Sequence, residues 1–120
     1  MADDLVAAGA TPIALTDYIA MGVLDVDRAE TLVESIADAC TEADIAMLGG
    51  ETAEHPGVME ADEFDLSATA LGIVELGEEI DIAAVTPGDV IVGIKSPNLR
   101  SNGFSLVRAI AALHGEADRL

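Results

Sequence analysis

Residues 45–57 read IAMLGGETAEHPG, and the interpretation of the whole chain starts from this stretch. Its first four residues, 45–48, form a short apolar segment typical of a buried strand. Residues 49–57 contain three glycines and a proline, so we expect a loop there. Glycines directly after a strand let backbone N–H groups approach a phosphate closely. Glu51 stands where a carboxylate could hold Mg²⁺, although a glycine turn with a solvated acid fits the same pattern.

The flanking sequence alternates between predicted helices and strands. Periodicity predicts an amphipathic helix from Asp27, which with Glu30 forms a capping-box pattern, to about Ala43. The other predicted elements are a short helix over 1–10, strands over 11–20, 64–74 and 90–94, a turn over 86–89, and a helix that starts near Ser101. This alternation predicts an α/β or α+β fold.

Composition limits the classes of function. Hydrophobic residues make up 51% and aromatic residues 2% of the chain, so the core must be aliphatic. A formal net charge of −18 disfavours nucleic acid as a partner and is better tolerated in molar salt, where the Debye length is ~3 Å. Because the acids are spread along the chain, a halophilic cytoplasm explains them better than a basic partner does. One cysteine, no signal-peptide pattern and only short apolar runs favour a cytoplasmic protein without a membrane span.

A few other residues are candidates for chemistry. Asp17 is an acid in an apolar strand, which indicates either an exposed position or a ligand site. Asp4 lies in the first helix, where an acidic helix start is the simpler reading. Arg100 and Ser101 precede a helix whose N-terminus could bind an anion, with a serine cap and surface arginines as the alternative. His55 could donate a proton but is better read as a surface residue, and no zinc spacing is present. Cys40 lies on the apolar stripe of the long helix and is interpreted as a small buried hydrophobe.

Taken together, segments along the chain resemble the AIR synthetase family in order and spacing. The segments that carry the resemblance are Asp3–Pro12, Asp17–Ala20 with Leu24–Asp25, Gly49–Glu54 with Pro56–Gly57, Phe64–Leu66 leading to Gly72–Glu75, Pro87–Val90 and Ser101–Arg108. They cover about residues 2–110. One such motif is weak evidence, but several in register make a chance match improbable.

The resemblance implies a mixed sheet with helices on one face. It assigns residues 1–86 to the later part of an ATP-binding N-terminal domain and residues 87–120 to the first strand and helix of a C-terminal domain. It implies ATP-dependent ring closure of formylglycinamidine ribonucleotide in purine synthesis, by activation of an amide oxygen through phosphoryl transfer. A homodimer formed through the N-terminal sheet is also implied.

The same resemblance suggests roles for individual residues. Asp4, Gly49, Gly50 and Glu51 fall at the Mg-ATP site, with Asp4, Glu51 and, more weakly, Asp17 as metal ligands. Arg100, Ser101 and Asn102 fall near the substrate, and Glu51 and Asn102 are the candidate catalytic residues.

The sequence departs from the family pattern at three positions. Asp3 stands where Asn is usual, His55 where Met is usual, and Arg100 where His is common. An arginine does not deprotonate, so acid–base chemistry at that position is in doubt while anion binding is not. The family's Asp-Gly-Val-Gly-Thr-Lys loop and most of its C-terminal domain are expected outside this chain, which predicts weak catalysis by the chain alone.

Two alternatives remain open at this point. The first is a paralogue from the same ATP-using superfamily, such as formylglycinamidine ribonucleotide synthetase, selenophosphate synthetase, thiamine-phosphate kinase or a hydrogenase maturation protein. The second is a catalytically inert truncated fragment that only dimerises. Exposed strand edges would then predict aggregation.

Overall fold

The computed structural model describes residues 1–93, 95–96 and 102–115. The chain divides into two compact units, Met1–Val85 and Thr86–Leu120. In chain order the elements are α1, β1, α2, β2, β3, a 3₁₀ helix at Ile82–Ala84 and α3. None of the helices in the described part of the chain is long and apolar enough to span a membrane.

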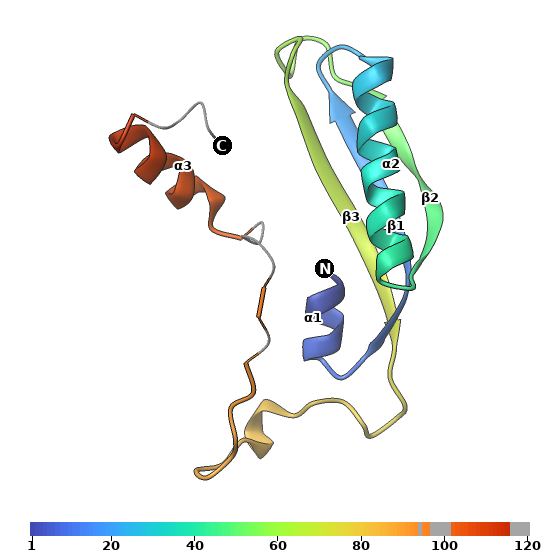
Figure 1. Cartoon of the computed structure of the whole chain (residues 1–120). Helices are drawn as coiled ribbons and strands as arrows, with labels where there is room; N and C mark the ends of the chain where they lie inside the picture. The colour runs from blue at the N-terminus through green and yellow to red at the C-terminus, as the bar shows by residue number, and fades with distance from the viewer. Residues whose placement is uncertain (94, 97–101, 116–120) are drawn as a thin grey trace. The chain divides into compact units, whose positions relative to one another are not determined.

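A three-stranded mixed sheet forms the first unit (Figure 1). The central strand β1 (Thr11–Met21) pairs in parallel with β2 (Ala46–Glu54) and antiparallel with β3 (Phe64–Ile73). Parallel strands need a long crossover connection, and the helix between β1 and β2 supplies it. The strands predicted over 11–20 and 64–74 are therefore confirmed to within about one residue.

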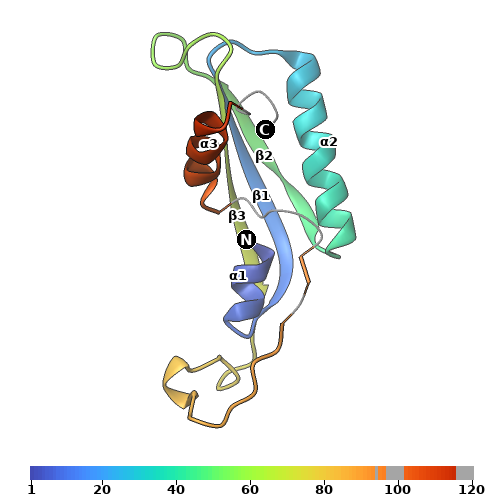
Figure 2. The same cartoon turned by 60° about the vertical axis from the view of Figure 1, so that its left-hand side comes forward.

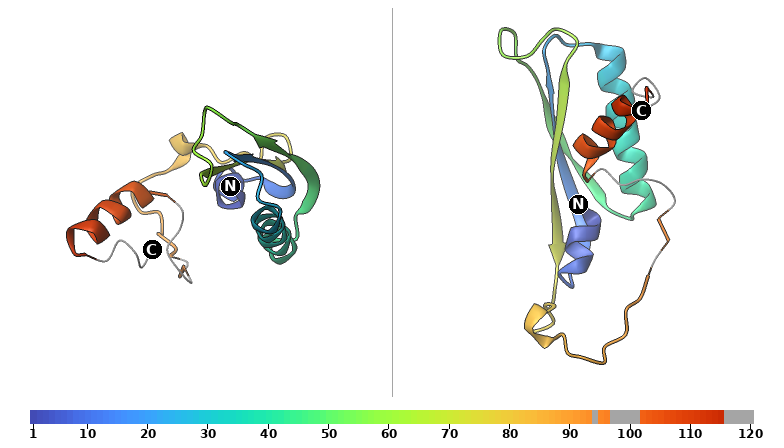
Figure 3. Two further views of the ribbon diagram at one scale, coloured as in Figure 1. Left: turned by 90° about the horizontal axis from the view of Figure 1, so that it is seen from above. Right: turned by 90° about the vertical axis from the view of Figure 1, so that its left-hand side faces the viewer.

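Two helices cover one face of this sheet. Helix α2 (Val26–Glu42) runs alongside the strands in Figure 2, and α1 (Ala2–Ala7) lies on the same side in the right-hand view of Figure 3. Successive residues of a strand point to opposite faces of the sheet. Asp17, Ile19 and Met21 are two positions apart, so they share a face. These three are 8%, 0% and 1% exposed, which identifies theirs as the covered face. The predicted mixed sheet with helices on one face is confirmed.

The core of the first unit is small. In the described part of the chain its members are Ala14, Ile19, Ala20, Met21, Cys40 and Ile45, all aliphatic or sulfur-containing. Cys40 is buried on α2 with a free thiol, as its place on the apolar stripe predicted. The low aromatic content therefore produces a core built from short side chains, in which each large side chain carries much of the buried area.

The start of α2 differs from its predicted capping. The N-cap is Asp25, whose Oδ1 accepts a hydrogen bond of 3.1 Å from the backbone N–H of Arg28, and not the predicted Asp27. Arg28 then reaches across to the loop before β3: its Nη1 donates to the Asp62 carbonyl oxygen at 2.9 Å, and its guanidinium lies 5.5 Å from the centroid of the Phe64 ring. The Asp25 cap and the contacts of Arg28 thus hold the start of α2 next to the start of β3.

Replacement of Asp25 by alanine is expected to lower the free energy of unfolding by about 1 kcal/mol, because an N-cap acceptor is lost. Asp27→Ala is the matched control, since Asp27 lies in the first turn and interacts only with the helix dipole, for an effect of about 0.3–1 kcal/mol. Urea titration in molar KCl compares the two variants. A larger loss for Asp27→Ala would restore Asp27 as the cap.

Strand β2 is longer than predicted. Residues 49–54, expected to be a loop, continue the strand and pair with β1 as far as Met21 opposite Glu54. The register shifts between Leu15 and Thr16, where Leu48 is skipped, so β2 contains a bulge just before its two glycines. The bulge accommodates the glycines without ending the ladder, because the neighbouring strand still satisfies the backbone hydrogen bonds.

The second unit contains a turn and one helix in its described part. Asp89 closes the predicted turn: its N–H donates to the Thr86 carbonyl oxygen at 3.2 Å, and its Oδ2 accepts from the Thr86 N–H at 2.8 Å. The strand predicted over 90–94 is wrong for residues 90–93, which pair with no other strand and whose valines and isoleucine are 80–97% exposed. An apolar run needs a partner strand to form a ladder. Helix α3 (Phe104–Leu113) begins after Gly103, which is its N-cap in place of the expected Ser101.

Candidate functional site

The two glycines of β2 are required for different reasons. Gly49 has a φ of 126°, a backbone conformation that side chains other than glycine rarely adopt, and open space surrounds it. At Gly50 the limit is steric. A Cβ placed there would overlap the Asp17 carboxylate and lie 2.6 Å from the Asp17 carbonyl oxygen. The sequence signal Gly-Gly therefore combines one conformational and one steric requirement.

Strand register places Glu51 and Asp17 on opposite faces of the sheet. Asp17 lies opposite Gly50, and Tyr18 lies opposite Glu51. Paired residues share a face and successive residues alternate, so Glu51 stands with Tyr18 on the face without helices. On β3, Ser67 is the partner of Tyr18 and extends this row. Glu51 is exposed, and its carboxylate is open to a ligand from that side.

Tyr18 and His55 form a pair that local sequence patterns do not predict. The Tyr18 hydroxyl lies 2.8 Å from Nε2 of His55, and the two ring centroids are 6.4 Å apart. The backbone N–H of His55 also donates to the Met21 carbonyl oxygen at 2.7 Å, which holds the residue at the end of β2. His55 is therefore half-buried, and its hydrogen bond with Tyr18 lies at the surface.

Asp17 is the one buried charged side chain in the described part of the chain. Its Oδ1 has almost no contact with solvent and no hydrogen-bond partner there. Asp4, in contrast, is exposed in the first turn of α1, with a carboxylate oxygen 3.2 Å from the N-terminal nitrogen. Within residues 1–93, 95–96 and 102–115, no three His, Cys, Asp or Glu side chains gather closely enough to hold a metal ion. The structure thus does not bring Asp4, Asp17 and Glu51 together as one ligand set.

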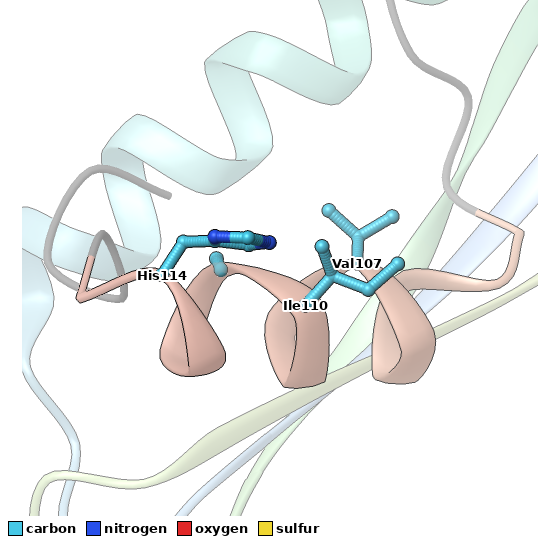
Figure 4. Close-up of a pocket in the computed structure, with 4 residues that line it drawn as sticks. Val107, Ile110 and His114 are labelled. Atoms are coloured by element: carbon cyan, nitrogen blue, oxygen red, sulfur yellow. The ribbon is translucent and has the colours of Figure 1, made fainter.

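The predicted substrate residues fall in the second unit. Asn102 is exposed in the turn before α3, while Arg100 and Ser101 lie outside the described residues. Along α3, the side chains of Val107, Ile110, Ala111 and His114 line a shallow depression (Figure 4). Three of these side chains are apolar, and His114, the C-cap of the helix, offers one ring that can donate or accept a hydrogen bond.

Acidic and basic side chains are divided unevenly between the two units. Residues 1–85 contain 20 acidic side chains and one basic one, Arg28, which leaves a net formal charge of −19. Residues 86–120 contain three acidic and four basic side chains, for a net charge of +1. A polyphosphate bound against the sheet would therefore need cations to offset the acids, and carboxylates such as Glu51 are suitable oxygen ligands for Mg²⁺.

Comparison with known proteins identifies the sheet unit. Residues 1–74 match the family described as AIR synthase related protein, N-terminal domain. The chain is 48% identical over 113 residues, 94% of its length, to a chloroplastic/mitochondrial phosphoribosylformylglycinamidine cyclo-ligase of Vigna unguiculata, and 45% identical over 90% of its length to a phosphoribosylformylglycinamidine cyclo-ligase of Syntrophus aciditrophicus.

A likeness of fold comes from a solved structure, the hydrogenase maturation protein HypE in complex with ATP. The TM-score is 0.55 at 26% sequence identity, over 66% of this chain and 24% of that one. The chain spans 29% and 31% of the lengths of the two cyclo-ligases. With a family match over more than half of its residues, the chain belongs to the AIR synthase related family and contains its N-terminal domain fold.

Proposed function

We propose that the chain acts, as part of a longer protein, in the ATP-dependent cyclisation of formylglycinamidine ribonucleotide to aminoimidazole ribonucleotide, with release of ADP and phosphate. The observation that supports this most strongly is the 42–48% identity, over 90–96% of the chain, to relatives that are named phosphoribosylformylglycinamidine cyclo-ligase. The reaction belongs to de novo purine biosynthesis and fits a chain whose acids disfavour nucleic acid as a partner.

The residues of β2 suit a nucleotide site that depends on Mg²⁺. Mg²⁺ keeps several waters and is usually bound by one or two carboxylates together with substrate phosphates, so a cluster of three protein ligands is not required. The exposed Glu51 carboxylate fits this demand and is the protein ligand that we assign to the ion. The predicted metal role of Asp4 is not part of this proposal, because α1 covers the face of the sheet opposite to Glu51. When bound, the ion offsets the negative charge of the phosphates. Gly49 and Gly50 allow the phosphates to approach the β2 backbone closely.

We assign binding of the ribonucleotide to residues that precede α3 in the second unit. Asn102 can donate and accept hydrogen bonds, and Ser101 and Arg100 can bind the anionic ribonucleotide. With reactants held in this way, positioning and charge stabilisation supply most of the rate. The predicted metal role of Asp17 is not part of this proposal, because Asp17 and Glu51 face opposite sides of the sheet.

We further propose a cytoplasmic homodimer formed through the sheet. The face that carries Tyr18 and Glu51 has no helix over it, and β2 and β3 are both edge strands in the first unit. Leu71 on β3 pairs with Ala14 and is 48% exposed, which leaves apolar surface for a partner. Size-exclusion chromatography in molar KCl tests the dimer, and a monomer at all accessible concentrations would contradict it.

A second candidate function is that of a HypE-type ATP-binding protein, since the fold matches HypE in complex with ATP. Substrate dependence separates the two candidates. Release of ADP that requires formylglycinamidine ribonucleotide identifies the cyclo-ligase, whereas release that does not depend on this substrate favours the second candidate.

Glu51→Gln is expected to weaken binding of Mg-ATP at least about 10-fold, because the variant loses a charged oxygen ligand. Isothermal titration of the chain with Mg-ATP in molar KCl measures this effect. Glu30→Gln, an exposed change of equal charge on α2, is the matched control and should bind like the unaltered chain. Equal affinity of the Glu51 and Glu30 variants would remove Glu51 from the site. No binding by the unaltered chain would place essential parts of the site outside it.

A further inference from the structure

Asp17 is buried at a cost that its surroundings do not offset. A carboxylate taken out of water loses solvation and needs a hydrogen-bond donor or a cation in exchange. The only basic side chain of residues 1–85 is Arg28, which is engaged with Asp25, Asp62 and Phe64 at the start of α2. Oδ1 of Asp17 has no partner in the described part of the chain. A residue kept under these conditions is a candidate for a role other than stability.

The carboxylate is not placed to bind a ligand directly. Asp17 is 8% exposed and its Oδ1 is almost fully shielded, so an ion or phosphate approaching from solvent does not reach that atom. Glu51, the candidate ligand on the neighbouring strand, points to the other face. What Asp17 contacts instead is the backbone of β2, one residue before Glu51.

The contact between Asp17 and Gly50 is sterically complementary. The carboxylate fills the space that a side chain at Gly50 would need. Gly49 provides the contrast, because a Cβ there meets nothing within 4 Å and its glycine is required by its φ alone. The side chain of Asp17 therefore occupies the space that a side chain at Gly50 would take. From there it supports β2 at Gly50 on the covered face of the sheet.

Gly49 and Glu51, the residues on either side of Gly50 in β2, belong to the proposed nucleotide site. Thr16 pairs with Gly49 and Tyr18 pairs with Glu51, so the Asp17–Gly50 contact lies between them in the ladder. A bulge at Leu48 precedes this segment, and a bulge loosens and bends the strand that contains it. The path of β2 from Gly49 to Glu51 thus depends on the support that follows the bulge.

We infer that Asp17 is a positioning residue for Glu51: its side chain, seated against Gly50, fixes the course of β2 so that the Glu51 carboxylate is held on the uncovered face. The role depends on the volume and shape of the side chain, and it makes no direct contact with a ligand. This inference deepens the proposed Mg-ATP site and rests on it for the functional consequence, while its structural part is independent of ATP.

The structural part is tested by complementary substitutions in the whole chain. Gly50→Ala is expected to be strongly destabilising, because its methyl group overlaps Asp17. In the double variant Asp17→Ala, Gly50→Ala the overlap with the carboxylate is removed but the 2.6 Å approach to the Asp17 carbonyl oxygen remains, so only part of that stability should return. Amide hydrogen exchange at residues 50–52 in molar KCl should be faster in Asp17→Ala than in the unaltered chain and unchanged in Asp17→Asn, which preserves the shape of the side chain. Equal exchange in Asp17→Ala and the unaltered chain would overturn the inference.

The functional part is tested by titration with Mg-ATP. Asp17→Ala is expected to weaken binding about 10-fold, because the ligand residue is displaced, and to raise the Mg²⁺ concentration needed for half-maximal binding. Asp17→Asn preserves the shape and should bind within about twofold of the unaltered chain. If Asn were as impaired as Ala, charge and not shape would be the operative property, and the inference would fail. If the unaltered chain does not bind Mg-ATP, essential parts of the site lie outside it and amide exchange alone decides the inference.

Discussion

Lowering the KCl concentration from about 1 M to about 0.01 M is expected to unfold the first unit, since the Debye length grows from ~3 Å to ~30 Å. Residues 1–85 hold 20 acidic side chains and only Arg28 as a base, so repulsion within the unit is barely screened at low salt. Self-repulsion of this kind opposes the compact state. The core that resists it is small, with six apolar residues buried in the described part of the chain.

Helix α2 carries an aligned group of like charges. Glu30, Glu34, Asp38 and Glu42 are all exposed and recur every four residues, which stacks four like charges on one side of the helix. Like charges at this spacing destabilise a helix by about 0.2–0.5 kcal/mol per pair. Glu34→Lys with Glu42→Lys converts the column to alternating signs, and the midpoint KCl concentration for folding should fall.

Circular dichroism at a series of KCl concentrations measures that midpoint. Glu34→Gln with Glu42→Gln is the matched control, because it removes repulsion without adding attraction and should give an intermediate midpoint. Choline chloride separates general screening from specific binding of K⁺. A chain that remains folded at about 0.01 M salt, where screening is weak, would show that the acids are tolerated for another reason and would contradict the halophilic interpretation.

The spacing of apolar residues along the sequence identified the helix and strand whose own residues form an apolar face. The amphipathic helix, predicted over 27–43, is observed as Val26–Glu42, and the strand predicted over 64–74 as Phe64–Ile73. Both carry apolar residues at the spacing of their structure. Local sequence was insufficient where a neighbouring strand decides the outcome. Gly49–Glu54 has a loop-like composition but pairs with β1, and residues 90–93 have a strand-like composition but lack a partner.

The candidate site shows the same division. The Gly-Gly-Glu segment could be identified from the sequence, but it lies within β2 and not in a loop after the strand. The relation of Asp17 to Glu51 could not be predicted, because a register shift of one residue moves a side chain to the other face of a sheet. The bulge at Leu48 sets that register, and no local sequence pattern predicts the bulge. The Tyr18–His55 contact depends on the same pairing, since the residues are 37 positions apart.

Ile19→Ala is expected to lower the free energy of unfolding by about 2–5 kcal/mol, the usual cost of removing a buried aliphatic side chain and leaving a cavity. Ile19 is 0% exposed, lies in the central strand and pairs with Thr52 on one side and Leu66 on the other. Small domains are stable by only about 5–15 kcal/mol in total, so this loss is a large share of the whole. At reduced salt the variant should be unfolded.

Ile13→Ala is the matched control, because it makes the same chemical change in the same strand at a position that is 41% exposed. Its loss should be about 1 kcal/mol, since part of the side chain already contacts water. Urea titration in molar KCl gives both values, and an unchanged slope would show that the compactness of the two end states is preserved. Equal losses at both positions would mean that the covered face of β1 does not form the core of the unit. A loss at Ile19 alone ties stability to the covered face of β1, the face on which the Asp17 carboxylate is buried.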